Sequence, residues 1–129
     1  MAGFLEGYKV SVRDKFFEDL ATALDSWVNA AVASTTDPEV DFLWTEKPES
    51  FKALQAAFAQ SGISKNDVRQ VFLECLNGLT NSTLTIIDGG TALAEQARIR
   101  LVDEKGESLG EGLHDDFALY LLDTGRLSE

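Results

Sequence analysis

The chain has 129 residues, 44% of them hydrophobic and 26% charged, and its formal net charge at pH 7 is −11. This length is sufficient for a globular domain with a buried core, so we expect a single domain over residues 1–129. The acidic charge should repel nucleic acid and anionic membranes, because both carry phosphates, and it permits a basic protein as partner. The charge by itself, however, favours the simpler interpretation that it serves only to keep the protein soluble.

The cysteine content and the start of the chain predict a cytoplasmic protein. Cys75 is the only cysteine, so no internal disulfide can form and a reducing compartment is expected. The first ten residues lack the basic start and the apolar run of a signal peptide. No apolar run approaches membrane-spanning length, so we expect no membrane association.

The first predicted helix is amphipathic and long. Apolar residues recur at helical spacing as far as Val32, and Ser11 with Asp14 resembles a capping box, so the firm part of the helix should begin near residue 12. It should fade over residues 33–36, where the following Asp-Pro pair disfavours continuation.

Two shorter helices are predicted next. Residues 37–39 combine an N-cap, a proline at the first position and an acid, which predicts a short helix over 38–46. Pro48 then breaks that helix and opens another, for which Gly62 is a plausible C-terminal cap.

The most apolar predicted helix occupies residues 64–88, with Ser64 as its N-cap, and we expect the other elements to pack around it. Residues 83–87 have strand propensity, but their apolar residues stay in phase with the helix, so we expect a helix that ends before Gly89. Its shared apolar face should be buried, with Phe72 and Leu76 fully so. This face comprises Val68, Val71, Phe72, Cys75, Leu76, Leu79, Ile86 and Ile87.

The C-terminal third has a different pattern. Residues 97–102 alternate polar and apolar side chains like a half-buried strand, 103–106 form a turn, and 107–110 return as a second strand. A last helix should run from residue 113 to about 124. The predicted fold is therefore α+β and mostly α: three to four helices around the central helix near 64–88, with a C-terminal β-hairpin and a short closing helix.

Three strings in this region resemble a family of short uncharacterised bacterial proteins, a domain of unknown function. They are D-G-G-T-A-L at 88–93, I-R-L-V-D-E-K-G at 99–106 and L-H-D-D-F at 113–117. The resemblance covers about the last 40 residues. It implies a bacterial origin and a compact helical fold with a hairpin, and it gives no catalytic residue to carry over.

Few residues suggest catalysis or metal binding. Cys75 and His114 are the only cysteine and histidine, so a nucleophile–base pair would need both, but Cys75 lies on the apolar face like an ordinary core residue. A weak alternative is a divalent-metal site of Asp88, Glu111, His114 and Asp115. A single histidine is a poor basis for such a site, and the acids at 115 and 116 equally suit the start of a helix. We therefore expect no cofactor.

Two arginines of the predicted hairpin, Arg98 and Arg100, fall on one face of its first strand. We expect them to pair with nearby acids such as Glu107 or Glu111 rather than with phosphate.

The segment 37–46 is the predicted partner-binding site. It holds four acids and no base, interleaved with aromatic residues, and Phe42 is the apolar residue left over for the surface. The competing interpretation, which the usual burial of large aromatic side chains favours, is that Phe42 and Trp44 fill a gap between the first helix and the next. The predicted binding residues are Asp37, Glu39, Asp41, Phe42 and Glu46.

The sequence therefore favours a non-enzymatic acidic protein-binding module, such as an immunity or antitoxin-like inhibitor of a basic partner. The absence of a polar constellation at catalytic spacing supports this reading. One alternative is a small metal-dependent or small-molecule-acting enzyme that uses the acidic cluster around His114. Another is an accessory subunit that forms a homodimer.

Overall fold

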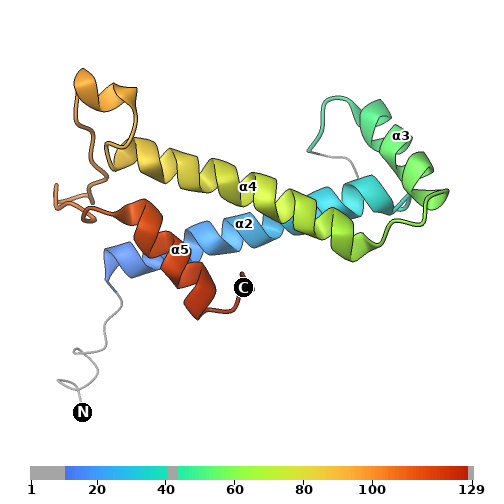
Figure 1. Cartoon of the computed structure of the whole chain (residues 1–129), viewed down its shortest axis with the longest axis horizontal. Coiled ribbons are helices and arrows are strands. Elements are labelled where there is room, and N and C mark those ends of the chain that lie inside the picture. The colour runs from blue at the N-terminus through green and yellow to red at the C-terminus, as the bar shows by residue number, and fades with distance from the viewer. Residues whose placement is uncertain (1–10, 41–43, 128–129) are drawn as a thin grey trace, which may run out of the picture. The chain divides into compact units, whose positions relative to one another are not determined.

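The computed structural model describes residues 11–40 and 44–127, in which the regular elements are all helices (Figure 1). The described chain forms two compact units, which we call the terminal unit (residues up to 22 and from 79) and the middle unit (residues 23–78). None of the described helices combines the length and apolarity needed to cross a membrane. The elements are α2 (Val12–Thr36), α3 (Pro48–Ala59), α4 (Lys65–Ile87), the 3-10 helix η1 (Ala92–Glu95) and α5 (Leu113–Asp123).

Helix α2 confirms the predicted boundaries of the first helix. The Ser11 hydroxyl accepts a hydrogen bond from the backbone N–H of Asp14 at 3.1 Å, as the capping pattern predicts. At the other end, the hydroxyls of Thr35 and Thr36 donate to the carbonyls four residues earlier, each at 2.7 Å. Hydroxyl bonds of this kind to the preceding turn slightly destabilise a helix, and α2 ends at Thr36.

The predicted helix over 38–46 is wrong for the part of it that is described. Residues 38–40 and 44–46 are turns, bends or irregular backbone, and residues 41–43 lie outside the described residues. The Asp37 carboxylate accepts a hydrogen bond from the Glu39 N–H at 2.9 Å, and the Asp37 carbonyl accepts one from Val40 at 3.3 Å. The acid therefore stabilises a local turn, which is the usual competitor of a helix start.

The next two helices agree with prediction at their starts. α3 opens with Pro48, although it ends at Ala59 with Gln60 as its C-cap instead of Gly62. The Ser64 hydroxyl accepts a hydrogen bond from Asp67 at the start of α4, and α4 continues through residues 83–87, so this segment is helix and not strand.

A glycine ends α4 as predicted. Gly89 has a φ of +82°, and its N–H donates to the carbonyl of Ile86 at 3.1 Å. The N–H of Gly90 donates to the carbonyl of Thr85 at 2.9 Å. This pair of bonds is the Schellman motif, in which a left-handed glycine turns the chain out of the helix.

The predicted C-terminal β-hairpin is wrong, and the fold class is all-α for the residues that the structure describes. Only an isolated antiparallel bridge joins Val102 to Ser108. The turn itself exists, because the Asp103 carboxylate accepts hydrogen bonds from the N–H groups of Lys105 and Glu107 at 2.8 and 2.9 Å. The alternating residues before it have no ladder of partners, and Ile99 remains 42% exposed. A polar–apolar alternation without a covered face does not make a strand.

The predicted burial of the α4 face is also wrong in detail. Phe72 and Leu76 are half-buried, Cys75 is exposed, and Leu79 is 67% exposed. The buried residue of α4 is Leu84, which the predicted face omits. Helical spacing shows which side chains share a face, but it does not show whether other elements cover that face.

Each unit has its own buried side chains. In the middle unit they follow α2 at four-residue steps, and in the terminal unit they join the start of α2, the end of α4 and α5. There the Phe17 ring lies 5.5 Å from Phe117 and 6.0 Å from Tyr120 between centroids. The buried apolar residues are Leu24, Val28 and Val32 in the middle unit, and Phe17, Ala21, Leu84, Leu109, Leu113, Phe117 and Leu121 in the terminal unit.

Candidate functional site

The middle unit contains an apolar groove of about 430 Å³ between α3 and the first turns of α4. We call it the α3–α4 groove. Three of its apolar side chains are more than half exposed: Leu54 at 52%, Ile63 at 55% and Val71 at 59%. Its only charged lining residue is Asp67. The lining comprises Thr35, Leu54, Ala57, Phe58, Ser61, Ile63, Asp67, Val68, Val71 and Phe72.

The groove follows from local folding of its two walls. Leu54 and Phe58 are four residues apart on α3, while Val68 and Phe72 have the same spacing on α4, so each pair projects from one side of its helix. The connection 60–64 contains Ser61, whose hydroxyl accepts from the Ile63 N–H at 3.3 Å and donates to the Phe58 carbonyl. Clustered exposed apolar side chains of this kind are typical of interaction surfaces.

Polar contacts to α2 hold both walls of the groove. The Gln55 amide on α3 donates to the carbonyls of Ser34 at 2.8 Å and Asp37 at 3.1 Å. The Arg69 guanidinium on α4 donates to the Asn29 side chain on α2 at 2.7 Å. Gln55 is itself buried and satisfies carbonyls that the end of a helix leaves without partners.

The structure describes only three of the five predicted partner-binding residues of segment 37–46. Asp37 is engaged in the turn at the end of α2, while Glu39 and Glu46 are exposed. Asp41 and Phe42 lie outside the described residues, so the prediction for Phe42 stays a prediction.

The neighbouring aromatic residue, Trp44, has a described environment. Its ring lies edge-on to Trp27 at 5.4 Å and to Phe51 at 5.1 Å between centroids. Trp44 therefore fills space between α2 and α3 while remaining 45% exposed.

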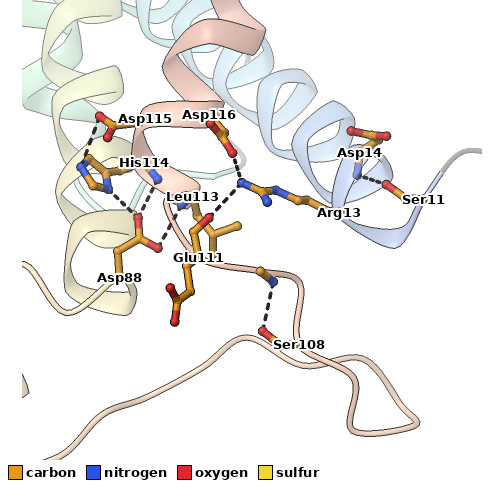
Figure 2. Close-up of polar contacts among 11 residues, drawn as sticks. Ser11, Arg13, Asp14, Asp88, Ser108, Glu111, Leu113, His114, Asp115 and Asp116 are labelled. Atoms are coloured by element: carbon orange, nitrogen blue, oxygen red, sulfur yellow. Dashed lines mark hydrogen bonds and ion pairs between the residues drawn. The ribbon is translucent and has the colours of Figure 1, made fainter.

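A second polar arrangement lies in the terminal unit, where Asp88 caps α5 (Figure 2). The N-cap residue of α5 is Gly112, which has no side chain to offer. Asp88 replaces it: one carboxylate oxygen accepts from the Leu113 N–H at 3.0 Å, and the other accepts from the His114 N–H at 2.8 Å. The same oxygen lies 2.5 Å from Nδ1 of the His114 ring. The Asp88 side chain is only 6% exposed.

These contacts shift the pKa values of both side chains. Burial raises the pKa of the Asp88 carboxyl, but the hydrogen bonds from the His114 ring and from the His114 and Leu113 backbone outweigh it, so the pKa lies below its ordinary value. The hydrogen bond to Asp88 raises the pKa of His114, with further help from the charge of Asp115. The pair is therefore favoured as carboxylate and imidazolium.

Arg13 connects α2 to the start of α5 in the same unit. Its guanidinium donates to the Glu111 carbonyl at 3.2 Å and pairs with the Asp116 carboxylate. Figure 2 shows the Glu111 carboxylate pointing away from Arg13. Since Asp116 lies in the first turn of α5, it also suits the positive end of the helix dipole.

The residues of the weak metal prediction serve different purposes here. Asp88 caps the start of α5 and contacts His114. The Asp115 carboxylate lies 3.4 Å from Nε2 of the His114 ring, and its side chain is exposed. Within the described residues no group of three or more His, Cys, Asp or Glu is placed to hold a metal ion. The other candidates from the sequence are Cys75, which is exposed on α4 in the middle unit, and His114, which belongs to the terminal unit.

The sequence predictions missed both the groove and the cap. The apolar residues at 54, 58 and 63 are visible in the sequence, but nothing local shows that they stay uncovered. The sequence predicts that Asp88 ends a helix, but it does not predict the contact of Asp88 with residues 113–114, because that contact depends on the tertiary fold. Comparison with protein-family models, curated proteins and solved structures gives no match, so the resemblance to short bacterial proteins stays a prediction.

Proposed function

We propose that the protein is a non-enzymatic, acidic protein-binding module whose α3–α4 groove receives a basic amphipathic helix of a partner protein. The observation that carries the proposal is the groove itself, in which Leu54, Ile63 and Val71 are each more than half exposed. Its volume of about 430 Å³ lies within the range of about 300–1,000 Å³ that is common for binding pockets. A groove between two helices suits apolar side chains at helical spacing on a partner helix.

The charge of the chain supports a basic partner. The net charge is −11, and residues 23–78 contain eight acids and four bases. Asp67 brings one of these acids into the groove lining. Acidic groups around an apolar surface speed the encounter with a basic protein, while the apolar contacts supply most of the affinity. Inhibition of a basic partner, as in immunity or antitoxin-like proteins, is the role that we infer for such a module.

The enzyme alternative has less support. Both oxygens of the Asp88 carboxylate accept hydrogen bonds from the start of α5, so the most buried acid near His114 serves to join two helices. We therefore do not propose the cluster around His114 as a catalytic centre.

The test uses a designed helical peptide with leucines at helical spacing and lysines elsewhere, and a scrambled peptide of the same composition. Fluorescence anisotropy should show saturable binding of the patterned peptide, stronger than the scrambled one and weakened by salt. Val71→Ser should weaken this binding without changing the melting temperature, because Val71 is already 59% exposed.

Leu79→Ser is the matched control, since Leu79 lies on the same helix, is 67% exposed and is absent from the groove lining. Equal affinity of the patterned and scrambled peptides would overturn the proposal. So would a Val71→Ser variant that binds as tightly as the unchanged protein.

A further inference from the structure

A second cavity, of about 490 Å³, lies in the terminal unit. The end of α4, residues 98–101 and the start of α5 line it, and we call it the arginine pocket. Arg98, Arg100 and His114 bring three basic side chains to its lining, while Ile87 and Ile99 supply apolar surface. In a chain with 22 acids and 11 bases, such a grouping of bases in one cavity is unusual.

The two arginines lack the acidic partners that the sequence predicts. The ion pairs among the described residues involve Arg13, Lys15 and His114, and the expected contacts of Arg98 or Arg100 with Glu107 or Glu111 do not form. An arginine fork matches the paired oxygens of a carboxylate or phosphate group. No ion pair within the described residues occupies either guanidinium group, so both are available to an anion from outside the chain.

Gly89 leaves room for the Arg98 side chain. Its guanidinium lies directly over Gly89, where a Cβ atom would meet Nη1 at 1.9 Å. Gly89 also needs its φ of +82° to end α4. One glycine thus turns the chain and leaves the room that Arg98 occupies at the edge of the pocket.

The acids of the pocket leave the arginines uncompensated. Asp88 directs both carboxylate oxygens to Leu113 and His114, so it offsets the charge of the histidine. Glu111 is the remaining acid of the lining, and it lies on the exposed side of the loop before α5. Its negative charge opposes the binding of an anion, so removal of this charge should strengthen the binding of an anionic ligand.

We propose that the arginine pocket binds a small organic acid, with its oxyanion group held by Arg98 and Arg100 and its apolar part against Ile87 and Ile99. The shared chemistry of the ligand is a carboxylate or phosphate group attached to a short apolar body. A pocket of this volume accommodates a small molecule rather than a macromolecule. The lining of the arginine pocket belongs to the terminal unit, whereas the lining of the α3–α4 groove belongs to the middle unit.

The test is calorimetric titration of the whole protein with succinate, phenyl phosphate and inorganic phosphate, each against sodium chloride of matched ionic strength. We expect saturable binding of at least one organic acid. Comparison of succinate with phenyl phosphate shows whether the pocket prefers a carboxylate or a phosphate group on its ligand. Arg100→Gln should weaken that binding on the order of tenfold, the scale of one lost charge-assisted contact. Glu111→Gln should tighten it, because it removes the opposing charge.

Lys52→Gln is the matched control: it makes the same charge change as Arg100→Gln at an exposed position in the middle unit, and it should leave the affinity unchanged. Arg100 is preferred to Arg98 because it does not pack over Gly89, and the melting temperature of each variant confirms that it folds. The proposal is overturned if no probe shows saturable binding up to about 10 mM, a dissociation constant worth only about 2.7 kcal/mol of binding free energy. It is also overturned if Arg100→Gln and Lys52→Gln have the same affinity as the unchanged protein.

Discussion

Replacing Asp88 by alanine tests the contact that joins the end of α4 to α5. The substitution leaves the N–H groups of Leu113 and His114 without their acceptors, and loss of a helix cap usually costs about 1 kcal/mol. It also removes a charged hydrogen bond to the His114 ring, for which the usual range is about 1.5–3 kcal/mol. The His114 side chain is 31% exposed, so water screens part of that bond and we take the lower end.

The expected loss for Asp88→Ala is therefore about 2–3 kcal/mol of unfolding free energy. At roughly 4 °C per kcal/mol for a chain of this size, the melting temperature should fall by about 8–12 °C. Asp88→Asn should cost less, because an asparagine oxygen still accepts one backbone hydrogen bond and asparagine is a good helix cap.

Urea unfolding followed by the helical circular dichroism signal measures these losses. Glu104→Gln is the control, since it removes one acid from an exposed turn and should leave stability unchanged. If Asp88→Ala costs less than about 0.5 kcal/mol, the usual range for surface changes, then Asp88 does not hold α5 and the reasoning fails.

Two further predictions concern stability. Because the pKa of His114 is raised, the stabilisation that His114 provides is complete below its ordinary pKa of 6.5 and is lost as the pH rises through the raised pKa. The pKa of Asp88 is lowered, so the stabilisation that Asp88 provides is present above its ordinary pKa of 3.8 and is lost as the pH falls through the lowered pKa. The melting-temperature difference between the unchanged protein and His114→Gln should therefore be larger at pH 5.5 than at pH 8.5, and an equal difference would contradict this. Phe117→Ala should lower the free energy of unfolding by about 3–5 kcal/mol, because Phe117 is only 2% exposed. Leu79→Ala should leave it nearly unchanged, because Leu79 is 67% exposed. Comparable losses for the two variants in denaturant unfolding would refute the assignment of the core.

The helix starts and the glycine stop were predictable because their signals are local. Ser11, Ser64 and Pro48 act at the ends of the helices that they begin, and Gly89 ends α4 through bonds to the preceding turn. Each of these signals involves residues that are close together along the chain, so no knowledge of the tertiary fold is required.

The remaining features depend on residues that are distant in sequence. The alternation over 97–102 had the pattern of a strand, but a strand needs a partner, and here only an isolated bridge forms. The acids and proline at 37–39 equally suit a helix start and a turn, and the Asp37 carboxylate stabilises the turn. The exposure of Val71 and the cap formed by Asp88 likewise depend on tertiary packing.

The bond between Gln55 and the end of α2 fixes the rotation of α3 about its own axis. Successive residues of a helix are turned by about 100°, so a helix held at one buried side chain has the directions of all its other side chains set as well. With Gln55 directed at the carbonyls of Ser34 and Asp37, Leu54 and Phe58 face the groove. A roll of α3 by one residue would withdraw the amide from both carbonyls and turn Leu54 away from α4. The groove wall is thus aligned by a polar side chain that does not itself line the groove.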